Sequence, residues 1–238
     1  MFAGPNGSGK STLKAHLRPD QLGCFVNADE IEAELRQNGS FNVSSFRLGH
    51  WETEFHEVCR KSTLIERVGS DVFWTERDLV QMDIEKLSSY HAALIAEFLR
   101  TALLSRQVSF SFETVMAHPS KVQILRDAKN LGYRTYLYFV ATEAPEINLA
   151  RIAYRVSEGG HQVSSDKVRS RFERSLGLLG EAIKNADRSY IFDNSQEGAA
   201  QTLLAEITGG QYGSIHVIGP DVPAWFKKYV LDQAQDAF

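Results

Sequence analysis

The stretch GPNGSGKST, from Gly4 to Thr12, decides the fold that this sequence predicts. Two glycines separated by four residues, with Lys and Ser directly after the second, form the phosphate-binding loop pattern of nucleotide-binding proteins. The apolar residues Met1 to Ala3 predict a buried strand before the loop, and the sequence from Lys10 to about Leu17 predicts a helix after it. A strand that enters this loop and a helix that leaves it are the context in which the pattern binds phosphate. We therefore expect a nucleoside triphosphate site here.

The chemistry of phosphate binding gives each part of the loop a role. The glycines let the backbone turn with its N–H groups pointing inward, and the positive end of the following helix faces the phosphates. Lys10 would add a charge at the β- and γ-phosphates, and the Ser11 hydroxyl would coordinate Mg²⁺. The expected nucleotide contacts come from the whole loop: Gly4, Pro5, Asn6, Gly7, Ser8, Gly9, Lys10, Ser11 and Thr12.

Further strands are predicted along the chain, separated by helical segments. Short apolar or alternating runs predict them at residues 23–26, 109–112, 136–140, 189–192 and 215–218. This order implies an α/β protein with the three-layer fold of P-loop kinases, in which a mostly parallel sheet is flanked by helices. We expect one domain over residues 1–238, a helical insertion at about 38–107, and an arginine-rich lid at about 151–175 that is interrupted at Gly159 and Gly160.

The composition excludes several classes of protein. A net charge of −4 and a pI near 6.0 argue against nonspecific electrostatic binding to a nucleic-acid backbone, because such binding needs a concentrated excess of Lys and Arg. The two cysteines, Cys24 and Cys59, have no metal-ligand or redox spacing. No apolar run reaches the length of a membrane span, and the N-terminus does not resemble a signal peptide. A cytoplasmic protein without membrane contact is the expectation.

Phosphoryl transfer also needs groups that orient an acceptor and stabilise charge. Asp29, after the second predicted strand, would face the γ-phosphate and accept a proton from an acceptor hydroxyl, although it can equally cap a helix. Glu113 would lie on the same sheet edge, near an acceptor hydroxyl or a water on Mg²⁺. Five arginines between Arg151 and Arg174 suit a closing lid, although a solvated helix face explains most of them as well. His161 receives no catalytic role.

Together these motifs resemble the zeta-toxin family of P-loop kinases, in particular a bacterial branch with GPNGSGKST, NADEI, FET and RVxxGGHxV. The resemblance spans most of the chain and keeps the order of the motifs. The matching pieces are Gly4–Thr12, Asn27–Ile31, Phe112–Thr114, Gly132–Phe139, Arg155–Val163, Arg171–Ser175 and Asp193–Ser195.

The resemblance implies an ATP- and Mg²⁺-dependent kinase that phosphorylates UDP-N-acetylglucosamine and has a small antitoxin as partner. By position, Asp29 corresponds to the residue that activates the sugar hydroxyl, and Arg155 and Arg171 to the lid arginines. Glu113 and Thr114 correspond to the substrate contacts. The region from Ser40 to Ser88 is longer than the family pattern, which leaves open a kinase for another metabolite, nucleotide or antibiotic. An ATP-binding switch without phosphoryl transfer also remains open.

Overall fold

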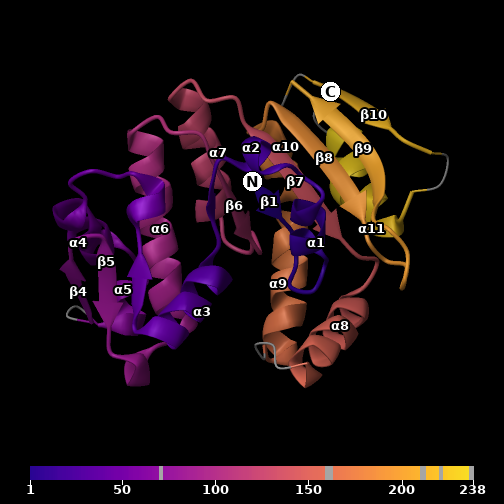
Figure 1. Ribbon diagram of the computed structural model, residues 1–238. Helices are drawn as coiled ribbons and strands as arrows, with labels where there is room; N and C mark the ends of the chain where they lie inside the picture. The colour runs from indigo at the N-terminus through magenta and orange to yellow at the C-terminus, as the bar shows by residue number, and fades with distance from the viewer. Residues whose placement is uncertain (70–71, 159–162, 210–212, 220–221, 236–238) are drawn as a thin grey trace. The chain divides into compact units, whose positions relative to one another are not determined.

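The computed structural model describes residues 1–69, 72–158, 163–209, 213–219 and 222–235 (Figure 1). The chain forms two compact units. The first consists of Met1–Leu17 and Glu113–Phe238, and the second of Arg18–Phe112. The second unit therefore contains the whole of the predicted insertion at 38–107.

A mostly parallel sheet organises the first unit, as the sequence predicted. Its strands, in spatial order, are β10 (Ser214–Val217), β9 (Thr202–Thr208), β8 (Arg188–Asp193), β7 (Tyr136–Ala141), β1 (Phe2–Ala3) and the end of β6 (Phe110–Thr114). β1 pairs in parallel with both neighbours, since Phe2 lies opposite Glu113 on β6 and Tyr138 on β7. The loop that follows β1 thus leaves from between two parallel strands. Phe2 and Ala3 are buried.

β9 is a strand that the sequence predictions did not include. It pairs antiparallel with β8 on one side and with β10 on the other. Its sequence, TLLAEIT, is rich in Leu, Ala and Glu, which favour helices over strands when judged locally. The two ladders and the burial of Leu204, Ala205 and Ile207 override that local preference.

Helices complete the first unit. They are α1 (Lys10–Ala15), α7 (Ser120–Asn130), α8 (Pro145–Ser157), α9 (Ser165–Gly177), α10 (Leu179–Lys184), α11 (Ala224–Phe226), the π-helical η4 (Lys227–Leu231) and α12 (Asp232–Gln235). The predicted lid at 151–175 falls on α8 and α9, which lie side by side (Figure 1). Gly159, Gly160 and His161 lie outside the described residues.

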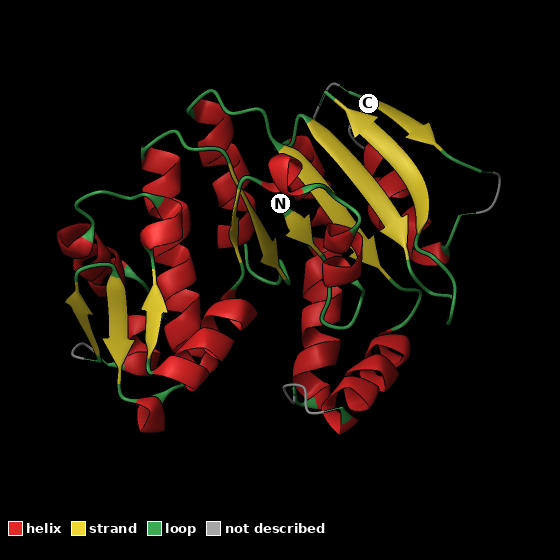
Figure 2. Cartoon of the chain, viewed as in Figure 1, coloured by secondary structure: helices red, strands yellow, loops and turns green. Residues whose placement is uncertain are grey.

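The second unit combines helices with a small sheet. Its elements are α2 (Pro19–Leu22), β2 (Cys24–Val26), α3 (Ala28–Asn38), β3 (Ser40–Asn42), η1 (Ser44–Phe46), α4 (Glu52–Lys61), α5 (Ile65–Val68), β4 (Phe73–Glu76), β5 (Leu79–Met82), η2 (Ile84–Lys86) and α6 (Ser89–Ser105). β2 pairs in parallel with the first part of β6, where Val26 lies opposite Phe112. Strands β3, β5 and β4 form a separate antiparallel sheet (Figure 2).

The prediction that residues 38–107 are helical is therefore wrong for these three strands. β4 and β5 form a hairpin in which Glu76 lies opposite Leu79, so that Arg77 and Asp78 alone make the turn. Arg77 adopts φ 53°, and a positive φ at the first loop residue is what the favoured two-residue hairpin turns need. Val80 and Met82 are buried in alternation along β5. This short alternating pattern lies between long helical patterns, so it did not indicate a strand.

The core of the second unit is built on aromatic residues. Trp51, Phe55 and Phe98 are fully or almost fully buried, and their ring centroids lie 5.1–5.9 Å apart. Leu94 and Leu99 on α6 are also buried. Trp51 and Phe55 recur at helical spacing, as do Leu94, Phe98 and Leu99, and such spacing puts each group on one face of a helix.

Candidate functional site

The loop Gly4–Thr12 has a backbone that side chains would disturb. Gly4 adopts φ 140°, and a Cβ atom there would lie 2.0 Å from the carbonyl oxygen of Val140 on β7. Gly9 adopts φ 100° and forms the N-cap of α1, where the Leu13 N–H donates to its carbonyl oxygen. Positive φ values of this kind are rare for residues with a side chain. The glycines thus allow the tight turn between β1 and α1.

Lys10 and Glu113 face each other beside the loop. The Lys10 ammonium donates to the carbonyl oxygens of Gly4 and Pro5, at 2.9 Å each, and lies 3.9 Å from a carboxylate oxygen of Glu113. The Ser11 hydroxyl donates to the same carboxylate at 3.1 Å. Lys10 is buried and the Glu113 side chain is 13% exposed. The pairing of Glu113 with Phe2 across the sheet puts this carboxylate next to the loop.

Three amide side chains for which no role was predicted also contact the loop. Asn148 on α8 donates to the Asn6 carbonyl oxygen at 2.6 Å. Asn194, after β8, donates to the Ser8 carbonyl oxygen at 2.8 Å. Gln201, before β9, donates to the Gly9 carbonyl oxygen at 2.6 Å. We call Asn148, Asn194 and Gln201 the amide set.

A hydrogen-bond network fixes the segment that carries Asn194. The Asp193 carboxylate accepts from the Ser195 hydroxyl at 2.7 Å and from the Trp225 indole at 2.9 Å. The Ser195 hydroxyl in turn accepts from the Glu143 N–H at 2.8 Å. Burial and the nearby Asp193 charge raise the pKa of the Glu143 carboxyl. The end of β8 is thereby tied to the end of β7.

Asp29 lies in the second unit, in the first turn of α3. Its side chain is exposed. The helix cap is Asn27, whose side-chain oxygen accepts from the Asp29 N–H at 2.9 Å. The prediction that Asp29 caps this helix is therefore wrong, because the capping oxygen comes two residues earlier. The Asp29 carboxylate stays available for another role.

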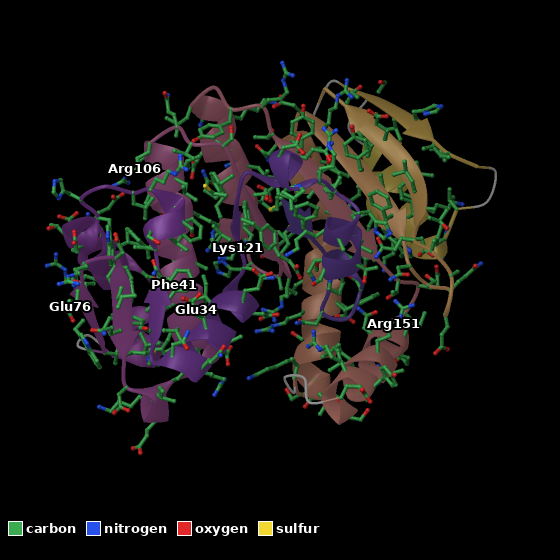
Figure 3. All side chains as sticks on the ribbon, viewed as in Figure 1. Glu34, Phe41, Glu76, Arg106, Lys121 and Arg151 are labelled. Carbon is green, nitrogen blue, oxygen red and sulfur yellow. The ribbon has the colours of Figure 1, made fainter. Side chains whose placement is uncertain are left out.

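The lid arginines are divided between α8 and α9. Arg155 is exposed in the last turn of α8, whereas Arg171 is half-buried on α9. Arg169 forms an ion pair with Glu146 that joins the two helices. Arg151, labelled in Figure 3, donates to the Gln196 carbonyl oxygen at 3.4 Å. Within the described residues, the Arg171 guanidinium makes no hydrogen bond or ion pair.

Thr114, the predicted substrate contact beside Glu113, is half-buried at the end of β6. Its hydroxyl oxygen accepts from the Met116 N–H at 3.0 Å. Met116 is fully buried with φ 53°, a conformation that this hydrogen bond supports. In this hydrogen bond the Thr114 hydroxyl is the acceptor, so it does not use its own proton.

The side chains beside the loop fit an Mg²⁺ ion that is bound partly by substrate phosphates and waters. They do not form a metal site made of protein ligands alone. No cluster of three His, Cys, Asp or Glu side chains that could hold a metal occurs among the described residues. Mg²⁺ typically keeps several waters and binds one or two protein oxygens together with substrate phosphates. The Ser11 hydroxyl and the Glu113 carboxylate, 3.1 Å apart, supply such a pair of oxygens.

Across the part of the chain that the structure covers, no helix is long and apolar enough to cross a membrane.

The sheet, the loop and its flanking strand and helix define an α/β protein with the fold of the P-loop kinases. Residues 77–199, over half of the chain, match the family model described as zeta toxin, and the chain belongs to this family. An uncharacterized protein of Haemophilus influenzae is 33% identical over 172 residues, which cover 72% of this chain and 90% of that protein.

Solved structures of the AvrRxo1-ORF1:AvrRxo1-ORF2 complex contain a chain of the same fold. The structure with sulphate ions gives a TM-score of 0.57 at 16% identity, over 91% of this chain and 60% of that chain. The structure with ATP gives a TM-score of 0.54 at 16% identity, over 91% and 59%. The chain thus spans about three fifths of the length of these neighbours. At this identity the likeness concerns the fold.

Proposed function

We propose that this protein is an ATP-dependent kinase for a small molecule and that its acceptor is the amino-sugar hydroxyl of UDP-N-acetylglucosamine. The observation that carries the proposal is the arrangement of Lys10, Ser11 and Glu113 around the Gly4–Thr12 loop. Membership of the zeta toxin family supports it, and so does a structural neighbour that was solved with ATP. The nucleotide sugar itself rests on the family resemblance.

In this proposal the loop holds the triphosphate of ATP. The N–H groups of the loop point at the phosphates, and Lys10 moves from the carbonyl oxygens of Gly4 and Pro5 to the β- and γ-phosphates. The Ser11 hydroxyl and the Glu113 carboxylate would hold Mg²⁺. This ion, when bound, neutralises charge that develops on the phosphate oxygens.

The acceptor residues then complete the transfer. The acceptor oxygen forms a bond to the γ-phosphorus, and the bond from that phosphorus to the bridging oxygen of ADP breaks. The carboxylate of Asp29 takes the proton of the acceptor hydroxyl. Arg155 and Arg171 stabilise negative charge on the transferred group, and Thr114 donates a hydrogen bond to the acceptor.

Two other functions follow from specific features. The antiparallel sheet β3, β5 and β4 lies in the long region between Asp29 and Glu113, and a different acceptor-binding surface there would select another metabolite, nucleotide or antibiotic. A nucleotide-dependent switch would use the same loop without an acceptor. Tight ATP binding with negligible transfer to any acceptor would distinguish the switch from both kinases.

The test measures transfer of labelled γ-phosphate from ATP to UDP-N-acetylglucosamine by the purified protein. We expect Lys10→Met and Asp29→Asn to abolish transfer, whereas Asp20→Asn, an exposed aspartate of the second unit, should leave it unchanged. Consumption of ATP with label on no nucleotide sugar would reject this acceptor. A screen of a metabolite extract with labelled ATP would then identify the alternative.

We further propose a protein partner and a location. The structural neighbours are complexes of AvrRxo1-ORF1 with AvrRxo1-ORF2, which supports a small antitoxin-like partner for this chain. The proposed acceptor is a cytoplasmic metabolite, so we place the protein in the cytoplasm. Copurification of the product of an adjacent reading frame, with inhibition of the kinase, is the expected result for such a partner.

A further inference from the structure

Five carbonyl oxygens of the phosphate-binding loop accept hydrogen bonds from Lys10 or the amide set. Lys10 donates to the carbonyl oxygens of Gly4 and Pro5. The amide set donates to the carbonyl oxygens of Asn6, Ser8 and Gly9. The three amides come from α8, from the end of β8 and from the segment before β9. Donors from separate parts of the first unit thus converge on a single loop.

Two of these amides also occupy the space next to Gly9. A Cβ atom at Gly9 would lie 2.4 Å from the Asn194 amide nitrogen and 2.7 Å from that of Gln201. At the other end of the loop, Asn148 is fully buried, and its own side-chain oxygen accepts from the buried Thr142 hydroxyl. The amide of Asn148 therefore has a fixed orientation, with its nitrogen toward the loop.

A peptide group whose C=O is held in one direction presents its N–H in a defined direction, because the peptide unit is planar. Lys10 must leave its two carbonyl oxygens to reach a phosphate, whereas the nitrogens of the amide set donate to the loop backbone and need not move. These three amides can hold the loop both before and after the nucleotide binds.

We infer that Asn148, Asn194 and Gln201 are positioning residues that hold the loop backbone in the conformation that binds a polyphosphate. The inference rests on the proposed function for the nucleotide but not for the acceptor. Since the amide set acts through the loop backbone, it supports any ligand with a di- or triphosphate group and does not distinguish nucleobases.

The experiment measures dissociation constants by calorimetry for ATP, GTP and inorganic tripolyphosphate. The variants Gln201→Glu and Asn194→Asp keep the side-chain size and remove the donor. Each should raise the dissociation constants of all three ligands by about tenfold, because a loop carbonyl oxygen that has lost its amide donor then faces a carboxylate. Gln123→Glu, on the exposed surface of α7, is the matched control and should bind like the wild type.

Asn148→Asp gives the same test at a fully buried position, and the two other variants keep the test valid if it fails to fold. Urea unfolding separates positioning from stability, since a merely structural residue would lower the free energy of unfolding and leave the affinity of the folded protein unchanged. Unchanged affinities in Gln201→Glu and Asn194→Asp would overturn the inference, as would a loss confined to one nucleobase. If the wild type binds none of the three ligands, the proposed function fails instead.

Discussion

The close approach of Gly4 to β7 makes Gly4→Ala the sharpest test of the loop geometry. The new methyl group would lie 2.0 Å from the Val140 carbonyl oxygen, whereas an ordinary contact needs about 3.4 Å or more, so the loop or β7 must move. Overpacking of this kind costs about 1–3 kcal/mol. The φ of 140° adds about 1–3 kcal/mol for a residue with a side chain. We expect the free energy of unfolding to fall by about 2–6 kcal/mol.

Two other glycines of the first unit separate these contributions. Gly132 has φ 82° and open space around it, so Gly132→Ala should cost only about 1–2 kcal/mol for the backbone conformation. Gly177, at the end of α9, has neither a positive φ nor a close neighbour. Gly177→Ala should therefore be neutral or stabilise by up to about 1 kcal/mol.

The assay is urea unfolding followed by circular dichroism, with and without ATP and Mg²⁺. A ligand at a hundred times its dissociation constant stabilises a protein by about 2.7 kcal/mol, and Gly4→Ala should lose this increment because the displaced loop no longer binds it. The steric argument is refuted if Gly4→Ala costs no more than Gly132→Ala. Retention of the full ATP-dependent increment would refute the link to the site.

Three more predictions follow from individual side chains. Glu113→Gln should lower the free energy of unfolding by about 1–2 kcal/mol, because its contacts with Ser11 and Lys10 are weakened. It should also lower kcat by about a hundredfold. Unfolding curves measure the first effect and steady-state kinetics the second. Burial lowers the pKa of His91. The buried neutral imidazole therefore stabilises the fold fully above its unfolded pKa of about 6.5, and this contribution is lost as the pH falls. His91→Gln should flatten the decrease in the free energy of unfolding between pH 7.5 and 5.5, and an unchanged slope would contradict this. Burial raises the pKa of the Cys59 thiol to about 12, so iodoacetamide should label Cys24 in the native protein and should reach Cys59 only after denaturation, as mass spectrometry of the peptides would show.

The parts of the site that could be predicted from the sequence are those with a local signal. The loop follows from nine consecutive residues, and Glu113 follows from the rule that parallel strands end at one edge of a sheet. The central strands also have a local signal, since short apolar or alternating runs identify them. Asp29 was predicted as a candidate by its place after a strand, and its catalytic role stays a prediction.

The amide set had no such signal. Asn148 lies within a helix between Ile147 and Leu149, where an isolated polar residue usually faces solvent. Its partner is a backbone carbonyl oxygen 142 residues earlier in the chain. The sequence of a loop does not reveal which distant side chains bind its backbone. β9 was missed for a related reason, because its stability comes from ladders to β8 and β10 and not from its own residues.

The central position of β1 has a consequence for how the protein is made. Its partners β6 and β7 lie more than a hundred residues later in the chain, and Gln201 lies later still. During synthesis the phosphate-binding sequence therefore leaves the ribosome well before β6, β7 and Gln201, and it has no sheet to join until those segments follow. Fragments that end before Gln201 lack its hydrogen bond to the Gly9 carbonyl oxygen. The loop conformation described above is therefore complete only in chains that extend past Gln201.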